Sequence, residues 1–174
     1  IDHAKDFDCY IALGGGSVID VAKLANLCIS SERDITQFLP KPLGEGKDYP
    51  RKLKPLIAVP TTAGTGSEVT CAAVIRVKNL KVGITLECLL PDLAIVDPLN
   101  TLTCPKNITA SSGFDALMHA LEAYTTKPEG DFYSGSNPIT DSLAERALEI
   151  IINSLERAYN ICLLYTSPSP RDRG

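Results

Sequence analysis

The stretch FDCYIALGGGSVIDVAK, residues 7–23, decides how this chain folds. Cys9–Leu13 is a short apolar run of the kind that forms a buried strand, and it ends in three glycines, Gly14, Gly15 and Gly16. A helical pattern follows from Val18 to about Ile29. A strand, a glycine turn and a helix in this order predict one unit of an α/β fold on a parallel sheet.

The pattern continues along the first part of the chain. Four further apolar runs are predicted to be strands: residues 56–59, 72–77, 81–86 and 93–96. Residues 31–55 carry several prolines and glycines and are predicted to form a loop. Continuous apolar runs are typical of strands with both faces covered by helices, so we expect a buried sheet.

The pattern changes to helices near Pro105. Two helical segments are predicted, Ser111–Tyr124 and Pro138–Tyr159. We therefore expect a partial α/β domain over residues 1–104 and the start of an all-helical domain over residues 105–160. After Asn160 the helical pattern stops, and residues 161–174 are interpreted as a cloning scar or a disordered terminus.

Composition excludes several classes of function. The 174 residues carry a net charge of −4 with scattered lysines and arginines, so we expect neither a nucleic-acid nor a membrane partner. No apolar run approaches the roughly 20 residues of a membrane-spanning helix. The six cysteines form no CxxC pair, which argues against a zinc ribbon and indicates a reducing, cytoplasm-like compartment. The chain opens at Ile1 without an initiator methionine, so we interpret it as an internal fragment.

The glycine turn is the first candidate binding site. Glycines let the backbone approach a ligand closely, and the helix behind them presents unpaired N–H groups to an anion. The alternative is a simple tight turn, because Ser17 and Asp20 match the S-x-x-D pattern of a capping box. The residues alone leave these two interpretations evenly weighted.

The second candidate site is the threonine-rich stretch after the next predicted strand. Thr61, Thr62, Thr65 and Gly66 supply hydroxyls and flexibility suited to a cofactor's ribose, phosphate or carboxamide. The alternative is again a helix start, with Thr65 and Glu68 as a capping box. Two such loops after parallel strands meet at the same edge of a sheet, where ligands bind.

The third candidate site is the pair Asp115 and His119. A spacing of four residues puts both side chains on one helical face, about 40° apart around the axis. A carboxylate and an imidazole so placed can share a divalent metal ion. The more frequent alternative is an ordinary Asp–His contact near a helix start.

Together these segments resemble the iron-containing (group III) alcohol dehydrogenase family. The matching segments are FDCYIALGGGSVIDVAK (7–23), PLIAVPTTAGTGSEVT (55–70), KVGI (81–84), LAIVDP (93–98) and GFDALMHALEAYTT (113–126). They occur in the family's order. Two stretches, PLGEGKDYPRKLKPLIAVPTT and GSNPITD, are most similar to the hydroxyacid–oxoacid transhydrogenase branch.

The resemblance implies a fold and a role for each matching residue. It implies a Rossmann-like dinucleotide-binding domain followed by a helical metal-binding domain, in a dehydroquinate-synthase-like architecture. Gly15, Gly16 and Ser17 would hold the pyrophosphate of NAD or NADP, with Gly14 and Asp20 close by. The threonine loop would line the nicotinamide half, and Lys81 would contact a ribose. Asp115 and His119 would be two of four ligands to Fe²⁺, or to Zn²⁺ as in some members.

The implied reaction is hydride transfer between NAD(P) and a small primary alcohol or hydroxyacid. A hydroxyacid–oxoacid transhydrogenase that keeps its cofactor bound is one alternative, and a non-catalytic nucleotide-binding fragment is another. The family's other two metal ligands are histidines further downstream, whereas this chain has only His3 and His119, so the fragment itself is expected to be inactive. The full-length protein is expected to be a homo-oligomer in the cytoplasm, or in mitochondria if the transhydrogenase interpretation is right.

Overall fold

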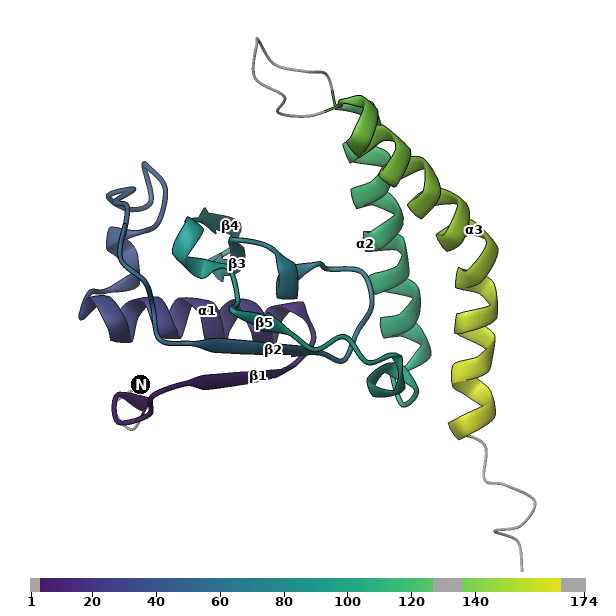
Figure 1. Ribbon diagram of the computed structural model, residues 1–174, viewed down its shortest axis with the longest axis horizontal. Coiled ribbons are helices and arrows are strands. Elements are labelled where there is room, and N and C mark those ends of the chain that lie inside the picture. The colour runs from purple at the N-terminus through teal and green to yellow at the C-terminus, as the bar shows by residue number, and fades with distance from the viewer. Residues whose placement is uncertain (1–3, 127–135, 167–174) are drawn as a thin grey trace, which may run out of the picture. The chain divides into compact units, whose positions relative to one another are not determined.

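The computed structural model describes residues 4–126 and 136–166, and for residues 161–166 it describes only the backbone. The chain divides into two compact units (Figure 1). The first consists of Ile1–Thr61 and Gly66–Pro98, and the second of Thr62–Thr65 and Leu99–Gly174. The change of unit at Pro98 lies a little before the predicted domain boundary at residue 104, and the tip of the threonine loop belongs to the second unit.

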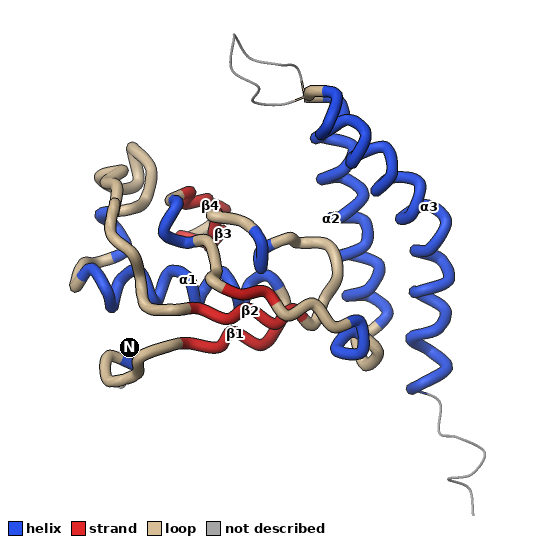
Figure 2. Tube along the Cα trace, in the orientation of Figure 1, coloured by secondary structure: helices blue, strands red, loops and turns tan. Residues whose placement is uncertain are grey.

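The first unit contains a three-stranded parallel sheet (Figure 2). Its strands are β1 (Tyr10–Gly14), β2 (Leu56–Pro60) and β5 (Leu93–Ala94), in the order β1-β2-β5. Tyr10 is aligned with Leu56, and Gly14 with Pro60. The glycine turn and the threonine loop therefore leave neighbouring strands at the same edge of the sheet.

Helix α1 (Gly16–Ser31) packs on one face of this sheet. Ile19 of the helix is fully buried against Ala12, Leu56 and Ala58 of β1 and β2. The expectation that both sheet faces are covered is wrong for the described residues, because Ile11 and Leu13 on the other face of β1 are 67% and 62% exposed.

A second, antiparallel pair of strands packs on α1 as well. Strands β3 (Ala72–Val77) and β4 (Leu80–Thr85) form a hairpin that turns at Lys78, whose φ is +55°. The larger core lies between this hairpin, α1 and the loop over residues 31–55. It contains Leu24, Leu27, Phe38, Leu39, Leu53, Ala73, Val82, Ile84 and Leu89. The predicted loop therefore contributes three core side chains, although its only regular element is the short helix η2 (Ile35–Gln37).

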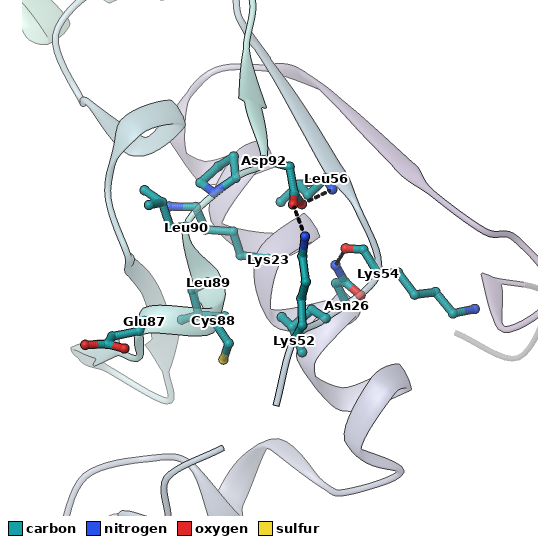
Figure 3. A pocket seen from close by; sticks show the side chains of 12 residues that line it. Lys23, Asn26, Lys52, Lys54, Leu56, Glu87, Cys88, Leu89, Leu90 and Asp92 are labelled. Atoms are coloured by element: carbon teal, nitrogen blue, oxygen red, sulfur yellow. Dashed lines mark hydrogen bonds and ion pairs between the residues drawn. The ribbon is translucent and has the colours of Figure 1, made fainter. Parts of the chain in front are cut away.

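The starts of β2 and β5 are held together at the edge opposite the two loops. Asp92 Oδ2 accepts a hydrogen bond of 3.0 Å from the Leu56 N–H, and Asp92 Oδ1 lies 3.1 Å from Lys52 Nζ. Lys52, Leu56 and Asp92 all line a pocket of about 280 Å³ (Figure 3). These interactions lower the pKa of Asp92, chiefly through the backbone N–H that stabilises the carboxylate.

The second unit contains two long helices, α2 (Lys106–Thr125) and α3 (Pro138–Thr166), which pack against each other. Gly113 allows close packing, since a Cβ atom there would lie 2.2 Å from Leu155 Cδ1. Both helices are longer than predicted. In particular, α3 continues to Thr166, so the expectation that the helix stops at Asn160 is wrong. Residues 167–174 of the predicted tail lie outside the described residues.

Three further helical turns complete the described chain: η3 (Ser67–Val69), η4 (Glu87–Leu89) and η5 (Pro98–Thr101). Among the described residues, no helix is both long enough and apolar enough to cross a membrane. The five cysteines whose side chains the structure describes are all free thiols.

Candidate functional site

The glycine turn joins β1 directly to α1. The helix begins at Gly16, and the carbonyl of Gly15 accepts hydrogen bonds from the N–H groups of Val18 (2.9 Å) and Ile19 (3.2 Å). The amides of Gly16 and Ser17 come before these and so have no acceptor within the helix. No acidic side chain lies in the first turn of α1. The unpaired N–H groups and the positive end of the helix dipole therefore suit a phosphate.

Gly14 permits the close approach of β1 to the first turn of the helix. A Cβ atom at this position would lie 2.7 Å from Val18 Cβ and 2.8 and 2.9 Å from the two methyl carbons of that side chain. Such contacts are shorter than van der Waals packing allows, so the turn needs glycine here. The backbone cradle is compatible with the pyrophosphate that the family resemblance implies at this position.

The predicted capping box of Ser17 and Asp20 is wrong. The helix starts two residues earlier than that pattern requires, so Gly15 is the N-cap residue and makes no side-chain cap. Asp20 instead reaches across to the second loop and the hairpin. Ser67 Oγ donates to Asp20 Oδ1, and the Val74 N–H donates to Asp20 Oδ2 at 3.0 Å. Asp20 thus fixes the base of the threonine loop, in addition to lying close to the glycine turn.

The threonine loop begins beside the glycine turn. The Thr61 N–H donates to the Gly14 carbonyl at 3.0 Å, which extends the pairing of β1 and β2 by one step. Gly66 has a left-handed conformation (φ +63°) and caps η3, whereas Thr65 precedes the cap, so the predicted capping box of Thr65 and Glu68 is also wrong. Thr61 and Gly66 lie in the first unit, whereas Thr62 and Thr65 belong to the second.

Lys23 is a residue of this region that the sequence analysis missed. Its side chain is fully buried, and Nζ donates to the carbonyl oxygens of Thr70 (2.7 Å) and Ala72 (2.8 Å). Burial lowers the pKa of Lys23, while the nearby Asp20 carboxylate acts in the opposite direction. The sequence did contain a signal, because Lys23 lies four residues from both Ile19 and Leu27 on the buried side of the helix.

Lys81 lies near the turn of the hairpin, where it is aligned with Arg76. Its side chain is exposed. Within the described residues, no hydrogen bond or ion pair links Lys81 to the glycine turn or to the threonine loop. Its assignment to a cofactor ribose stays a prediction.

Asp115 and His119 lie on α2 as the spacing predicted. His119 Nε2 is 4.0 Å from Asp115 Oδ1, and the two side chains are 54% and 49% exposed. The other ring nitrogen, Nδ1, lies 3.2 Å from the Gly64 carbonyl oxygen of the threonine loop. The two ligand atoms therefore face each other, and both remain accessible.

The donor set fits a transition metal. Carboxylate oxygen and imidazole nitrogen are ordinary ligands of Fe²⁺ and Zn²⁺, at distances of about 2.0–2.2 Å for zinc. Two neighbouring ligand atoms on such an ion lie about 3.0–3.5 Å apart. A small rotation of either side chain would bring His119 Nε2 and Asp115 Oδ1, now 4.0 Å apart, to that distance. No group of three metal-ligating side chains occurs within the described part of the chain. Asp115 and His119 are therefore half of a four-coordinate site at most.

Comparison with known proteins decides the family. Residues 2–98 match the family model for iron-containing alcohol dehydrogenases, and residues 109–162 match the model for the C-terminal part of the same family. The chain belongs to the iron-containing alcohol dehydrogenase family. The two matched ranges include the glycine turn, the threonine loop, and Asp115 and His119 on α2.

Sequence and structural relatives agree with this membership. The human mitochondrial hydroxyacid–oxoacid transhydrogenase is 47% identical over 167 residues, which cover 87% of this chain and 36% of the relative. An alcohol dehydrogenase from Oenococcus oeni superposes with a TM-score of 0.76 at 36% identity, covering 90% of this chain and 38% of that one. A sulfoacetaldehyde reductase from Bifidobacterium kashiwanohense, solved with NAD⁺, gives a TM-score of 0.75 at 33% identity, covering 93% and 45%.

The chain thus spans little more than a third of the human relative's length. The predicted family and its α/β-then-helical order are confirmed.

Proposed function

We propose that the full-length protein is a metal-dependent oxidoreductase that moves hydride between NAD(P) and a small primary alcohol or hydroxyacid. The observation that carries this proposal is the Asp115–His119 pair, whose facing oxygen and nitrogen lie 4.0 Å apart on one face of α2. Both side chains are about half exposed, so a ligand can reach them. Family membership adds the expectation that iron is the ion.

In this proposal the glycine turn and the threonine loop bind the dinucleotide. The amides of Gly16 and Ser17 hold the pyrophosphate, because they have no acceptor within α1. Thr61, Thr62, Thr65 and Gly66 lie against the nicotinamide half, and Lys81 contacts a ribose. NAD(P) supplies the hydride acceptor when it is bound.

Asp115 and His119 hold the metal, which acts when bound as a Lewis acid that favours loss of the alcohol proton. The carboxylate supplies negative charge and the neutral imidazole supplies a directional lone pair. The remaining ligands, the dehydroquinate-synthase-like arrangement of the domains and homo-oligomerisation are proposals for the full-length protein. Zn²⁺ is the alternative ion, since the same donor atoms bind it.

The test is the Asp115→Ala variant of the full-length protein. We expect loss of bound Fe²⁺ and of alcohol oxidation, with dinucleotide binding retained, because Asp115 belongs to a different unit from the glycine turn. Glu145→Ala, an exposed acidic residue on α3, is the matched control and should leave both properties unchanged. Wild-type metal content and turnover in Asp115→Ala would favour a non-catalytic nucleotide-binding protein instead.

A second candidate function is hydroxyacid–oxoacid transhydrogenation with a retained cofactor. It is favoured by the 47% identity to the human transhydrogenase. The assay supplies a hydroxyacid and a 2-oxoacid without added NAD(P) and measures formation of the second hydroxyacid. Turnover under these conditions supports the transhydrogenase. Turnover that needs added NAD(P) supports the dehydrogenase.

A further inference from the structure

The tip of the threonine loop packs directly on helix α2. Gly64 has φ +126°, in the region that favours glycine. A Cβ atom at this position would lie 2.1 Å from the Ser112 carbonyl oxygen and 3.1 Å from Ala116 Cβ. The first of these neighbours is backbone within a helix, which cannot move aside. The loop therefore reaches α2 only because residue 64 has no side chain.

This close approach brings the Gly64 carbonyl to His119. Its oxygen lies 3.2 Å from Nδ1 of the imidazole. A carbonyl oxygen can only accept a hydrogen bond, so the contact requires the proton of the neutral ring to be on Nδ1. Nε2 then keeps its lone pair, and Nε2 is the nitrogen that faces Asp115 Oδ1.

We propose that Gly64 is a positioning residue for the metal site: its carbonyl holds His119 in the Nδ1–H tautomer, with Nε2 directed to the ion. The inference rests on the proposed function, in which Asp115 and His119 are ligands. A backbone carbonyl on the second nitrogen of a ligating histidine fixes the tautomer and the ring orientation. The threonine loop thus has a role at the metal in addition to its predicted role at the cofactor.

The tautomer can be measured without any variant of the loop. Full-length protein labelled with ¹⁵N in its histidines is loaded with Zn²⁺, a diamagnetic probe, and the His119 ring is assigned by its loss in His119→Gln. We expect Nδ1 to carry the proton and Nε2 to show the shift of a metal-bound nitrogen. A proton on Nε2, or Nδ1 bound to Zn²⁺, would overturn the proposal.

A variant tests the steric part. Gly64→Ala in the full-length protein is expected to weaken Zn²⁺ binding, measured by competition with a chelator, by about 10- to 100-fold. The control is Gly83→Ala, where the added methyl meets nothing within 4 Å and binding should be unchanged. Unchanged affinity in Gly64→Ala would contradict the proposal. If Gly64→Ala does not fold, the tautomer of the wild-type protein still decides the question.

The Asp115→Ala variant separates this inference from the proposed function. If Asp115→Ala retains wild-type Zn²⁺ affinity, the metal site itself is misassigned. If Asp115→Ala loses Zn²⁺ while Gly64→Ala does not, and His119 carries its proton on Nε2, the metal site stands and only the role of Gly64 is wrong.

Discussion

The Lys23 ammonium lies 2.7 Å from the carbonyl oxygen of Thr70, at the end of the threonine loop. The same group donates to Ala72 at the start of β3. Together with the hydrogen bond from Ser67 to Asp20, this contact ties the far end of the loop to helix α1. One helix therefore holds both candidate cofactor loops. It holds the first through its N-terminus, and the second through the side chains of Asp20 and Lys23, about one and two turns further along.

Replacing Lys23 with methionine should destabilise the protein. Methionine fills a similar volume but leaves the two carbonyls without their donor, and an unsatisfied buried acceptor costs about 1–3 kcal/mol. The measurement is the free energy of unfolding in urea. The control is Lys47→Met, since Lys47 makes an exposed ion pair with Glu45 that is worth about 0–1 kcal/mol. Equal stability of the two variants would show that the Lys23 contacts contribute nothing.

Lys23 should also make stability depend on pH in the alkaline range. Its pKa in the fold lies below the ordinary value of 10.5, chiefly because burial penalises the charged form. Between the folded and unfolded pKa values the unfolded chain binds more protons, so unfolding becomes less favourable as pH rises through that window. The measured quantity is the free energy of unfolding of the wild type minus that of Lys23→Met. We expect this difference to increase as pH approaches 10.5. A decrease over this range would mean that the fold favours the ammonium.

Asp92 should contribute a dependence of the same sign in acid, where stability again rises with pH. Its pKa is lowered by the Leu56 N–H and, less strongly, by Lys52, so the folded protein favours the carboxylate. The stabilisation is fully present above the ordinary pKa of 3.8 and is lost as pH falls through the lower pKa of the fold. Asp92→Asn should remove this part of the acid sensitivity. The measurement is the unfolding free energy of both proteins from pH 6 down to acid unfolding, and identical slopes would contradict the assignment.

Local features of the fold were predictable because they depend on local pattern. Each apolar run became a strand within a residue or two, and the i,i+4 spacing placed Asp115 and His119 on one face of α2. What could not be predicted depends on partners distant in sequence. Asp20 and Lys23 bond to residues 47 to 54 positions away, so a helix-start pattern was mistaken for the role of Asp20.

The same limit explains the exposed strand face and the Gly64 contact. A continuous apolar run shows that a strand suits burial, but it does not show which elements cover it, and Ile11 and Leu13 have no cover among the described residues. The sequence marked Gly64 as one glycine of a loop. Only the structure shows that its carbonyl meets His119 and that a side chain there would collide with Ser112.

The glycine turn allows a test in which one variant should rescue another. Gly14→Ala places a methyl group 2.7 Å from Val18 Cβ, so we expect the first turn of α1 to shift and dinucleotide binding to weaken. Val18→Gly removes the three nearest atoms that the methyl would meet, at a cost in helix propensity below about 1 kcal/mol. NAD⁺ affinity of the full-length protein is measured by calorimetry for both single variants and for the pair.

If the clash causes the loss, the double variant binds NAD⁺ more tightly than Gly14→Ala alone, and the two effects are not additive. Because the rescuing change is at Val18, whose exposed side chain is 49% accessible, it should affect the turn rather than the core. Additive losses would mean that Gly14 acts through its own backbone conformation, and that the packing of β1 against α1 is not what shapes the phosphate cradle.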